Sequence, residues 1–347
     1  MEKQSNVKKI SSSIDMYYNR TISKDLSSLL EENGQLRWLF DFVKERKYKD
    51  LDFLIGKNKS KEWISVYRGL TRIISITLKD KSTICIDAAE TYKNILPALY
   101  GSKSINDNFQ NDIENLILQI EQNSKFVRYY NSEKEGYYQN ELSRIYGICG
   151  KPDDDFVIID KEVVIGYSSQ VVKDTLFGEI QQKYKKLQKQ ISAVNPERYG
   201  KDLEKKSIGN ELDFLALDKE GNILLMELKH GTNTSGIYLS PLQIGMYADI
   251  HKKFKEELGV SVFEMLEQKQ KIGLINPNWK KPNSIKDLIP VLIISNYNYA
   301  TREPNSRYDT KSKFEEILQL TRKQLGSNFL NNLRTLNYTT ENGLLNW

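Results

Sequence analysis

The second half of the chain alternates between two hydrophobic periods, one helical and one strand-like. Apolar residues at helical spacing predict helices over residues 171–191, 239–258 and 310–333. Near-continuous apolar runs predict short or buried strands over residues 156–167 and 287–298. We expect the middle helix to begin with Ser240 as its N-cap and Pro241 as its first residue.

The first half of the chain mixes helical and strand-like patterns. Helical patterns cover residues 23–47, 111–123 and 133–147, and β-rich segments cover residues 63–78 and 82–88. Two glycines, a proline and an acidic run meet in residues 147–155, which favours a domain boundary there. We therefore predict an N-terminal mixed α/β domain of unknown role over residues 1–150 and a second domain over residues 151–347. In the second domain, the order helix, hairpin, helix and strand indicates α/β layers.

One predicted hairpin carries charges inside its apolar runs, in the sequence GNELDFLALDKEGNILLMELKHG at residues 209–231. Both of its strands have apolar side chains on both faces, which is typical of a central sheet covered on each side. Asp213, Glu227 and Lys229 interrupt these runs. The turn KEG fits a three-residue loop that ends in a glycine with positive φ, here Gly221.

The turn decides which charged residues face each other. A three-residue loop pairs Asp218 with Asn222, so that Asp213 lies directly opposite Glu227 and Lys229 lies one step further on the same face. A four-residue loop would instead oppose Asp213 to Leu228 on the other face. The position of the glycine favours the first register, in which the Cβ atoms of the two acidic residues are about 5 Å apart.

Two directly opposed carboxylates are destabilising, and burial increases the cost. A divalent cation would offset the repulsion, because hard oxygen ligands suit Mg²⁺ or Mn²⁺. Lys229 would then stand beside the metal as a positive partner. The alternative is a strand end that emerges into solvent with an ordinary lysine–carboxylate pair.

Composition removes several other kinds of chemistry. The only cysteines are Cys85 and Cys149, which form no CxxC pair, and the only histidines are His230 and His251. Zinc ribbons, disulfide frameworks and sites built on several histidines are therefore excluded. No apolar run approaches the roughly 18 residues of a membrane span and no signal-peptide pattern is present, so we expect a cytoplasmic protein with no membrane contact. A net charge of +5 permits a polyanionic partner without requiring one.

Asp213, the Glu227-Leu228-Lys229 triplet and the Gln243-to-Tyr247 QxxxY pattern resemble the PD-(D/E)XK nuclease superfamily, in particular its RecB-like branch. The resemblance covers about residues 170–300. It implies an α/β fold, a three-layer restriction-endonuclease-like core in which helices flank a mixed central sheet. The first strand of the expected three-stranded meander is unclear, and either residues 163–167 or part of 199–208 would supply it. Leu212 replaces the proline that often precedes the aspartate.

The resemblance also implies roles for individual residues. Asp213 and Glu227, with the carbonyl of Leu228, would bind Mg²⁺ or Mn²⁺, and Lys229 would hold or deprotonate the attacking water. Gln243 and Tyr247 share one helix face, which the resemblance directs at the active site. Glu179 is the expected acidic residue on the preceding helix, although a solvated Glu–Lys pair explains it equally well, and Glu211 is another candidate. Six lysines are candidate phosphate contacts, namely Lys183, Lys185, Lys186, Lys189, Lys252 and Lys253.

Residues and resemblance together predict a metal-dependent nuclease, an endonuclease by preference, that hydrolyses phosphodiester bonds. We favour DNA over RNA as the substrate, and the sequence leaves both open. An N-terminal half without assigned chemistry would fit a sensor coupled to an effector, by analogy with bacterial anti-phage defence. That half could also contact a second copy or a partner protein. Two alternatives have different consequences: a non-catalytic nucleic-acid-binding module with a nuclease-like fold, and a structural or partner-binding protein.

Overall fold

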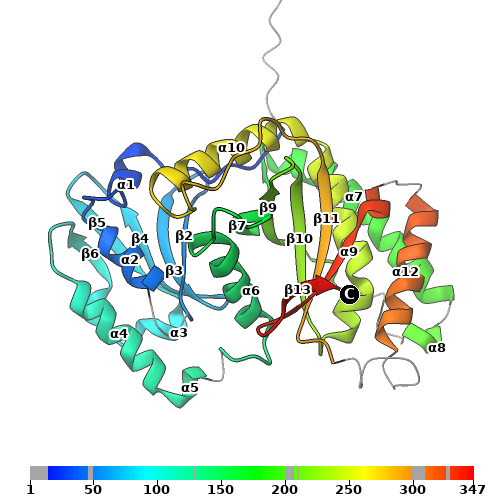
Figure 1. Cartoon of the computed structure of the whole chain (residues 1–347), viewed down its shortest axis with the longest axis horizontal. Coiled ribbons are helices and arrows are strands. Elements are labelled where there is room, and N and C mark those ends of the chain that lie inside the picture. Colours follow the sequence, from blue (N-terminus) through cyan, green and yellow to red (C-terminus); the bar gives the residue numbers. More distant parts are fainter. Residues whose placement is uncertain are drawn as a thin grey trace, which may run out of the picture.

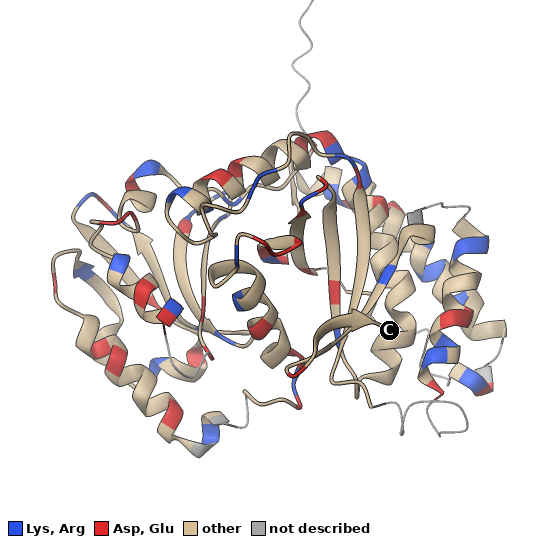
Figure 2. Cartoon of the chain, viewed as in Figure 1, with Lys and Arg blue, Asp and Glu red and all other residues tan. Residues whose placement is uncertain are grey.

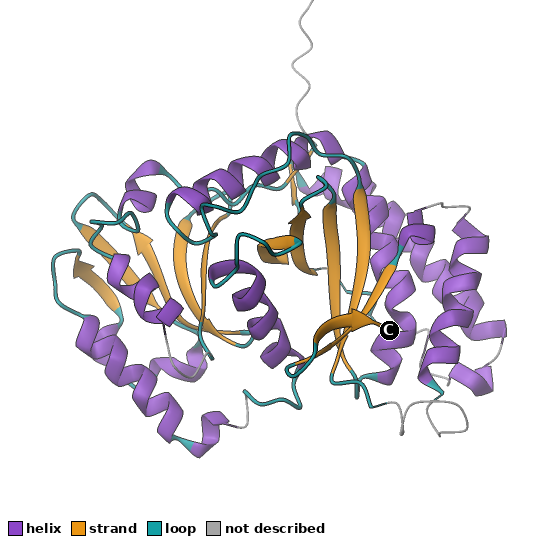
Figure 3. Ribbon diagram, in the orientation of Figure 1, coloured by secondary structure: helices purple, strands orange, loops and turns teal. Residues whose placement is uncertain are grey.

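The computed structural model describes residues 15–45, 50–127, 130–194, 196–199, 203, 207–209, 211–298, 309–325 and 329–347. These residues form a mixed α/β structure with two large sheets, one from each half of the chain (Figures 1 and 3). A short antiparallel pair of β1 (Met16–Tyr17) with β8 (Gly166–Tyr167) joins the N-terminal segment to the second half. The predicted mixed α/β class is confirmed.

The first sheet has five antiparallel strands in sequence order. They are β2 (Asp52–Lys57), β3 (Glu62–Arg68), β4 (Thr71–Leu78), β5 (Thr83–Asp87) and β6 (Gly101–Ser104). Its helical segments are α1 (Lys24–Ser28), α2 (Arg37–Glu45), α3 (Glu90–Lys93), η1 (Pro97–Leu99), α4 (Gln110–Gln122) and α5 (Ser124–Val127). Apolar side chains of α2 and α4 pack with those of the strands in one core.

The second sheet has six strands in the order β13-β12-β11-β10-β9-β7. These are β7 (Phe156–Val163), β9 (Leu212–Asp218), β10 (Ile223–His230), β11 (Leu288–Ser295), β12 (Arg334–Thr339) and β13 (Gly343–Asn346). Strands β7, β9 and β10 form an antiparallel meander, and β11 runs parallel to β10. The first meander strand is thus β7, and the prediction of residues 163–167 or part of 199–208 is wrong; Gly166 and Tyr167 form β8, which pairs with β1 instead.

Helices cover both faces of this sheet. The helical segments of the second half are α6 (Glu135–Ser143), η2 (Arg144–Ile148), α7 (Gln170–Val194), α8 (Pro196–Tyr199), α9 (Thr234–Lys252), α10 (Lys255–Lys271), α12 (Thr310–Leu325) and η4 (Phe329–Asn332). Leu215 and Leu225 share a core with α7, α9 and α12, while Phe214 and Met226 pack with Tyr138 of α6 on the other face. The predicted two-sided burial of the hairpin is confirmed.

Helix α9 begins earlier than its sequence suggests. Asn233 is its N-cap and accepts a hydrogen bond from the backbone of Gly236 at 3.0 Å, so Pro241 lies inside the helix. Proline has no N–H for the carbonyl four residues before it. The hydroxyl of Ser240 donates to that carbonyl, of Ile237, at 2.6 Å. Ser240 is therefore not the N-cap that was predicted; it supplies the hydrogen bond that Pro241 lacks.

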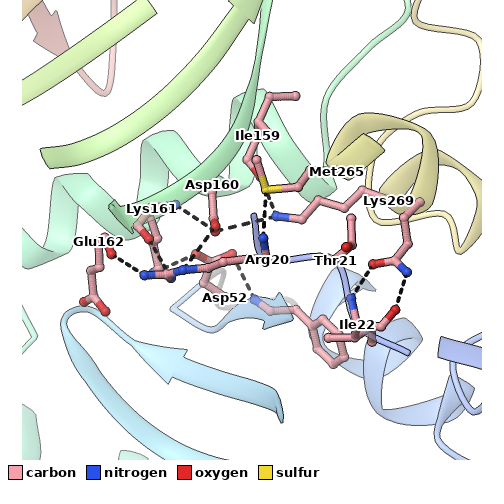
Figure 4. A network of polar contacts seen from close by, with 12 residues as sticks. Arg20, Thr21, Ile22, Asp52, Ile159, Asp160, Lys161, Glu162, Met265 and Lys269 are labelled. Carbon is pink, nitrogen blue, oxygen red and sulfur yellow. Dashed lines mark hydrogen bonds and ion pairs between the residues drawn. The ribbon is translucent and has the colours of Figure 1, made fainter. Parts of the chain in front are cut away.

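Charged groups link the two halves where β2, β7, α10 and the N-terminal segment meet (Figure 4). Lys161 of β7 is fully buried, and its ammonium lies 2.8 Å from the carboxylate of Asp52 on β2. Next to it, the buried Asp160 accepts a hydrogen bond from the hydroxyl of Tyr18 at 2.7 Å and lies 3.6 Å from Arg20. Buried charges need such partners, because their desolvation is costly.

The chain also crosses between the two cores. Met16 and Tyr18 pack in the core of the second sheet, whereas Ile272 and Leu274, which follow α10, pack in the core of the first. Helix α6 precedes the predicted boundary near residue 150 and yet packs on the second sheet. Residues on both sides of that boundary thus contribute to both cores.

Acidic and basic side chains are interspersed on α10 and α12 and do not form a surface of one sign there (Figure 2). Within the described ranges, no helix combines the length and apolar character needed to cross a lipid bilayer.

Candidate active site

The β9–β10 hairpin has the register predicted from its turn. Leu217 pairs with Ile223 and Phe214 with Met226, and the amide of Asp218 donates to the carbonyl of Asn222 at 3.0 Å. Gly221 closes the loop with a φ of 96°, a backbone conformation that favours glycine. Continuing this register by one residue sets Asp213 opposite Glu227, as expected.

Asp213 is held by hydrogen bonds to both of its carboxylate oxygens. Oδ2 accepts from the backbone amide of Leu228 at 2.7 Å, and Oδ1 accepts from the side-chain amide of Gln139 at 3.2 Å. Gln139 lies on α6, so this helix reaches the edge of the hairpin that carries the site. These contacts leave the Asp213 carboxylate little freedom to turn away from β10.

Glu227 is almost completely buried and has two different oxygens. Oε1 forms a short ion pair with the ammonium of Lys229, two residues further along β10. Oε2 has no hydrogen-bond partner among the described residues. A buried carboxylate oxygen without a partner is costly, because it has lost water and gained nothing in return.

The electrostatics of these groups are strongly coupled. Burial raises the pKa of Glu227 well above its ordinary value, and the charge of Asp213 raises it further against the opposing effect of Lys229. Burial also raises the pKa of Asp213, although Lys229 and the amide of Leu228 oppose the change. Burial disfavours the charge on Lys229, but Glu227 and Asp213 outweigh it and raise the pKa of that ammonium.

Glu135, at the start of α6, is a site residue that the sequence reasoning missed. Its Oε2 accepts a hydrogen bond from the backbone amide of His230 at 3.2 Å, at the end of β10. Burial raises the pKa of Glu135, with the charges of Lys229 and Asp213 acting on it in opposite directions. The charges of Glu227, Asp213 and Glu135 therefore all act on Lys229.

Glu179 was the acidic residue predicted for this role, and the structure does not bring it to the site. It is exposed on α7, and among the described contacts no hydrogen bond or ion pair joins it to Asp213, Glu227 or Lys229. Helix α7 lies between β7 and β9 in the chain, so it is not the helix that precedes the meander. That helix is α6, and its first residue is Glu135.

Gln243 and Tyr247 lie together on α9, as their spacing predicts. The amide of Gln243 donates to the hydroxyl of Tyr247 at 3.2 Å, and this hydroxyl donates to the carbonyl of Glu211 at 2.6 Å. Burial raises the pKa of Tyr247, and the charge of Glu227 adds to the effect, which places the phenol near the carboxylates. The Glu211 carbonyl, not its carboxylate, makes the contact to α9.

A glycine permits this arrangement. Gly209 has a φ of 85°, and a Cβ atom there would lie 2.5 Å from the Gln243 amide nitrogen and 2.7 Å from the Tyr247 oxygen. Beside these residues is a cavity of about 370 Å³ that Lys229 and Gln243 both line. The site is thus open to a ligand on the α9 side of Lys229.

The oxygen atoms of the site suit a hard divalent cation. The partnerless Oε2 of Glu227 and the mutual repulsion of Glu227 and Asp213 are features that a cation would relieve. Mg²⁺ or Mn²⁺ would be held by these two carboxylates, with the carbonyl of Leu228 as the expected third ligand. Across the described part of the chain, no three His, Cys, Asp or Glu side chains are already gathered as a metal-binding group.

The six lysines proposed as phosphate contacts lie at the surface. The ammonium of Lys183 pairs with Asp249 of α9 at 2.9 Å. The other five are exposed, namely Lys185, Lys186, Lys189, Lys252 and Lys253. Their role in binding stays a prediction.

Comparison of the chain with protein-family models, with curated proteins and with solved structures finds no match.

Proposed function

We propose that the protein is a metal-dependent nuclease that hydrolyses phosphodiester bonds, with DNA as the expected substrate. The observation that carries the proposal is the opposition of Asp213 and Glu227 on a buried hairpin, with Lys229 paired to Glu227. Two opposed carboxylates, of which Glu227 is buried and Asp213 half-buried, are destabilising, and they are difficult to explain unless the site serves chemistry. The cavity beside Lys229 gives a substrate a way in.

The order of elements supports the same function. Helix α6, the meander β7-β9-β10, helix α9 and the parallel strand β11 occur in this order along the chain, with η2 after α6, with β8, α7 and α8 between β7 and β9, and with α10 between α9 and β11. This is the helix, three-stranded meander, helix, strand order expected of the PD-(D/E)XK superfamily. We propose that the second half has the corresponding three-layer restriction-endonuclease-like core.

The side chains divide the work of hydrolysis between them. A bound Mg²⁺ or Mn²⁺ would lower the pKa of a water molecule and neutralise charge on the phosphoryl oxygens. Asp213 and Glu227 would hold the cation, and the amides of Leu228 and Gln139 keep Asp213 in place. Lys229 stabilises negative charge that develops on the phosphate, because its raised pKa keeps it protonated at neutral pH. Glu135 orients the end of β10 through the His230 amide.

One observation favours a second candidate, a nucleic-acid-binding module without catalysis. The ion pair between Lys229 and Glu227 satisfies one carboxylate oxygen without any metal. A protein that had lost catalysis could keep this pair for stability alone. Metal binding therefore separates the two functions.

Plasmid cleavage tests the proposal. Supercoiled circular DNA is incubated with the full chain and Mg²⁺ or Mn²⁺, with EDTA as the control, and a folded RNA is tested in parallel. We expect nicked or linear DNA with metal and none with EDTA, and no cleavage by Asp213→Asn. The alternative is a non-catalytic nucleic-acid-binding module. It would be identified if neither plasmid nor RNA is cleaved with either metal while the same DNA shows a salt-dependent mobility shift.

A further inference from the structure

A cavity of about 640 Å³ lies between the two halves of the chain, beside the N-terminal segment. Its walls come from the N-terminal segment, from the β2–β3 turn and from the region where β8 leads into α7. The volume is in the usual range for sites that bind small molecules. None of the residues used so far to explain catalysis lines it.

Aromatic side chains line this cavity, and two of them lie against a glycine. Trp63 pairs with Gly56 across β2 and β3, and a Cβ atom at Gly56 would come 2.9 Å from the indole. Tyr17 pairs with Gly166, where a Cβ atom would come 2.3 Å from the phenol ring. Tyr167, next to Gly166, is a third lining ring. The glycines let the first two rings lie close against the backbone.

The charge of the cavity has a single sign. Among the described residues that line it are Arg20, Lys57, Lys59 and Lys173, and no aspartate or glutamate. Within the described part of the chain, none of the three lysines forms an ion pair with a carboxylate; Lys57 lies near Thr21 and Lys59 near the carbonyl of Ser168. Arg20 is held by the carbonyl of Glu162 at 2.7 Å (Figure 4).

The first residue of α7, Gln170, also lines the cavity. This helix has 25 residues, and its positive N-terminal end adds to the field of the lysines, while Asp174 of its second turn accepts a hydrogen bond from the Gln170 side chain at 2.7 Å. A ligand that fits must therefore carry negative charge and a flat surface. Phosphate groups suit lysines and a helix N-terminus, and a planar base suits tryptophan and tyrosine rings.

We propose that this cavity binds a nucleotide, with its base against the aromatic walls and its phosphates at Lys57, Lys59 and Lys173. A neighbouring cavity of about 520 Å³ shares Tyr167 and Lys173 and extends to Tyr247 of α9. The nucleotide is thus either a free molecule or the end of a strand that continues towards the candidate active site. The inference does not depend on catalysis, since it rests on other residues.

Calorimetric titration of the full chain in EDTA tests the proposal. EDTA removes divalent metal ions, so phosphates cannot bind through a metal to Asp213 and Glu227. The probes are the four ribonucleoside triphosphates, an oligothymidylate of ten nucleotides, sodium triphosphate and adenosine. The variant is Lys59→Glu/Lys173→Glu, and the control is Lys81→Glu/Lys323→Glu, which makes the same charge change at exposed lysines outside the cavity. Trp63→Leu removes the indole.

We expect saturable binding of one nucleotide per chain that the Lys59/Lys173 variant weakens at least tenfold and the control leaves unchanged. Trp63→Leu should weaken the binding of nucleotides more than it weakens the binding of sodium triphosphate. Tight binding of triphosphates identifies a free nucleotide, and binding of the oligonucleotide alone identifies a strand end. The proposal is overturned if no probe binds at 1 mM, if sodium triphosphate binds as tightly as the nucleotides, or if the two lysine variants behave alike. Thermal melting of each variant shows that it is folded.

Discussion

The carboxylate of Asp213 on β9 accepts a hydrogen bond at 2.7 Å from the backbone amide of Leu228 on the neighbouring strand β10. The backbone pairs of β9 and β10 extend to Phe214 with Met226, so the Asp213 side chain meets β10 just beyond them. An aspartate in this position is fixed beside Glu227 even though the two charges repel each other.

Asp213→Asn should make the protein more stable at neutral pH. The pKa of Asp213 is raised in the folded state, so the fold binds this proton more tightly than the unfolded chain does. Stability is therefore lost as the pH rises from the ordinary carboxyl pKa through the folded one. Asparagine keeps an oxygen for the Leu228 amide and removes that loss. In EDTA, the variant's melting temperature should exceed the wild-type value by about 1 °C or more at pH 8 and not at pH 4. A gain of equal size at both pH values would contradict the electrostatic cause.

Mn²⁺ should raise the melting temperature of the wild-type protein and not that of Asp213→Asn. A ligand that binds only the folded state stabilises it by mass action, by about 2.7 kcal/mol at one hundred times its Kd. Differential scanning fluorimetry with millimolar Mn²⁺, or with EDTA, measures this effect. Equal shifts in both proteins would mean that the metal binds elsewhere.

Glu135→Gln should reduce DNA cleavage strongly, whereas Glu179→Gln should not. Glu135 is half-buried and interacts electrostatically with Lys229, whereas Glu179 is exposed on α7. Both substitutions remove one negative charge and keep the shape of the side chain, so they are a matched pair. Initial rates of plasmid nicking measure the difference. A larger loss of cleavage for Glu179→Gln than for Glu135→Gln would show that Glu179 is the acidic residue of the site, as the sequence predicts.

Lys229→Ala should abolish cleavage and also lower stability, because it leaves Glu227 buried without its ion-pair partner. Loss of one member of a buried pair costs about 3–5 kcal/mol. The double variant Glu227→Gln/Lys229→Ala should regain much of that stability and remain inactive. Urea unfolding and plasmid nicking measure the two effects. Wild-type cleavage by Lys229→Ala would remove the lysine from the mechanism.

Gly221→Ala should be more destabilising than Gly101→Ala. The two glycines have similar φ angles of 96° and 101°, so the backbone strain is comparable at about 1–2 kcal/mol. A Cβ atom at Gly221 would also come 2.2 Å from the carbonyl oxygen of Ser284, whereas one at Gly101 meets nothing within 4 Å. Urea unfolding should therefore place Gly221→Ala at least about 1 kcal/mol below Gly101→Ala. Equal costs would show that the hairpin loop can shift away from Ser284.

The hairpin could be predicted in detail because its register depends on local chemistry. The turn Lys219-Glu220-Gly221 admits few loop geometries, and alternation of side chains then fixes which residues share a face. The helix α9 could be predicted only in part. Pro241 normally marks a first helical turn, and the hydroxyl of Ser240 that compensates for it inside the helix is visible only once the backbone is known.

Glu135 could not be found from the sequence because the connection is not local. Helices α7 and α8 separate β7 from β9, so the helices that directly precede the hairpin in sequence are not the helix that supplies Glu135 and Gln139. The hydrogen bond from Gln139 to Asp213 spans 74 residues. The hydrophobic periodicity of a segment depends only on that segment, so it does not indicate which distant segment packs against it.

Lys161 is fully buried on β7, and its carboxylate partner Asp52 comes from the first sheet. This pair restricts how the gene can have been assembled. Recombination that joined residues 151–347 to an unrelated first half would bury a lysine with no anion opposite it, and the hybrid would be selected against before any new activity could be tried. The two halves are expected to have been inherited together, and a substitution at either residue is expected to persist only with a compensating change at the other.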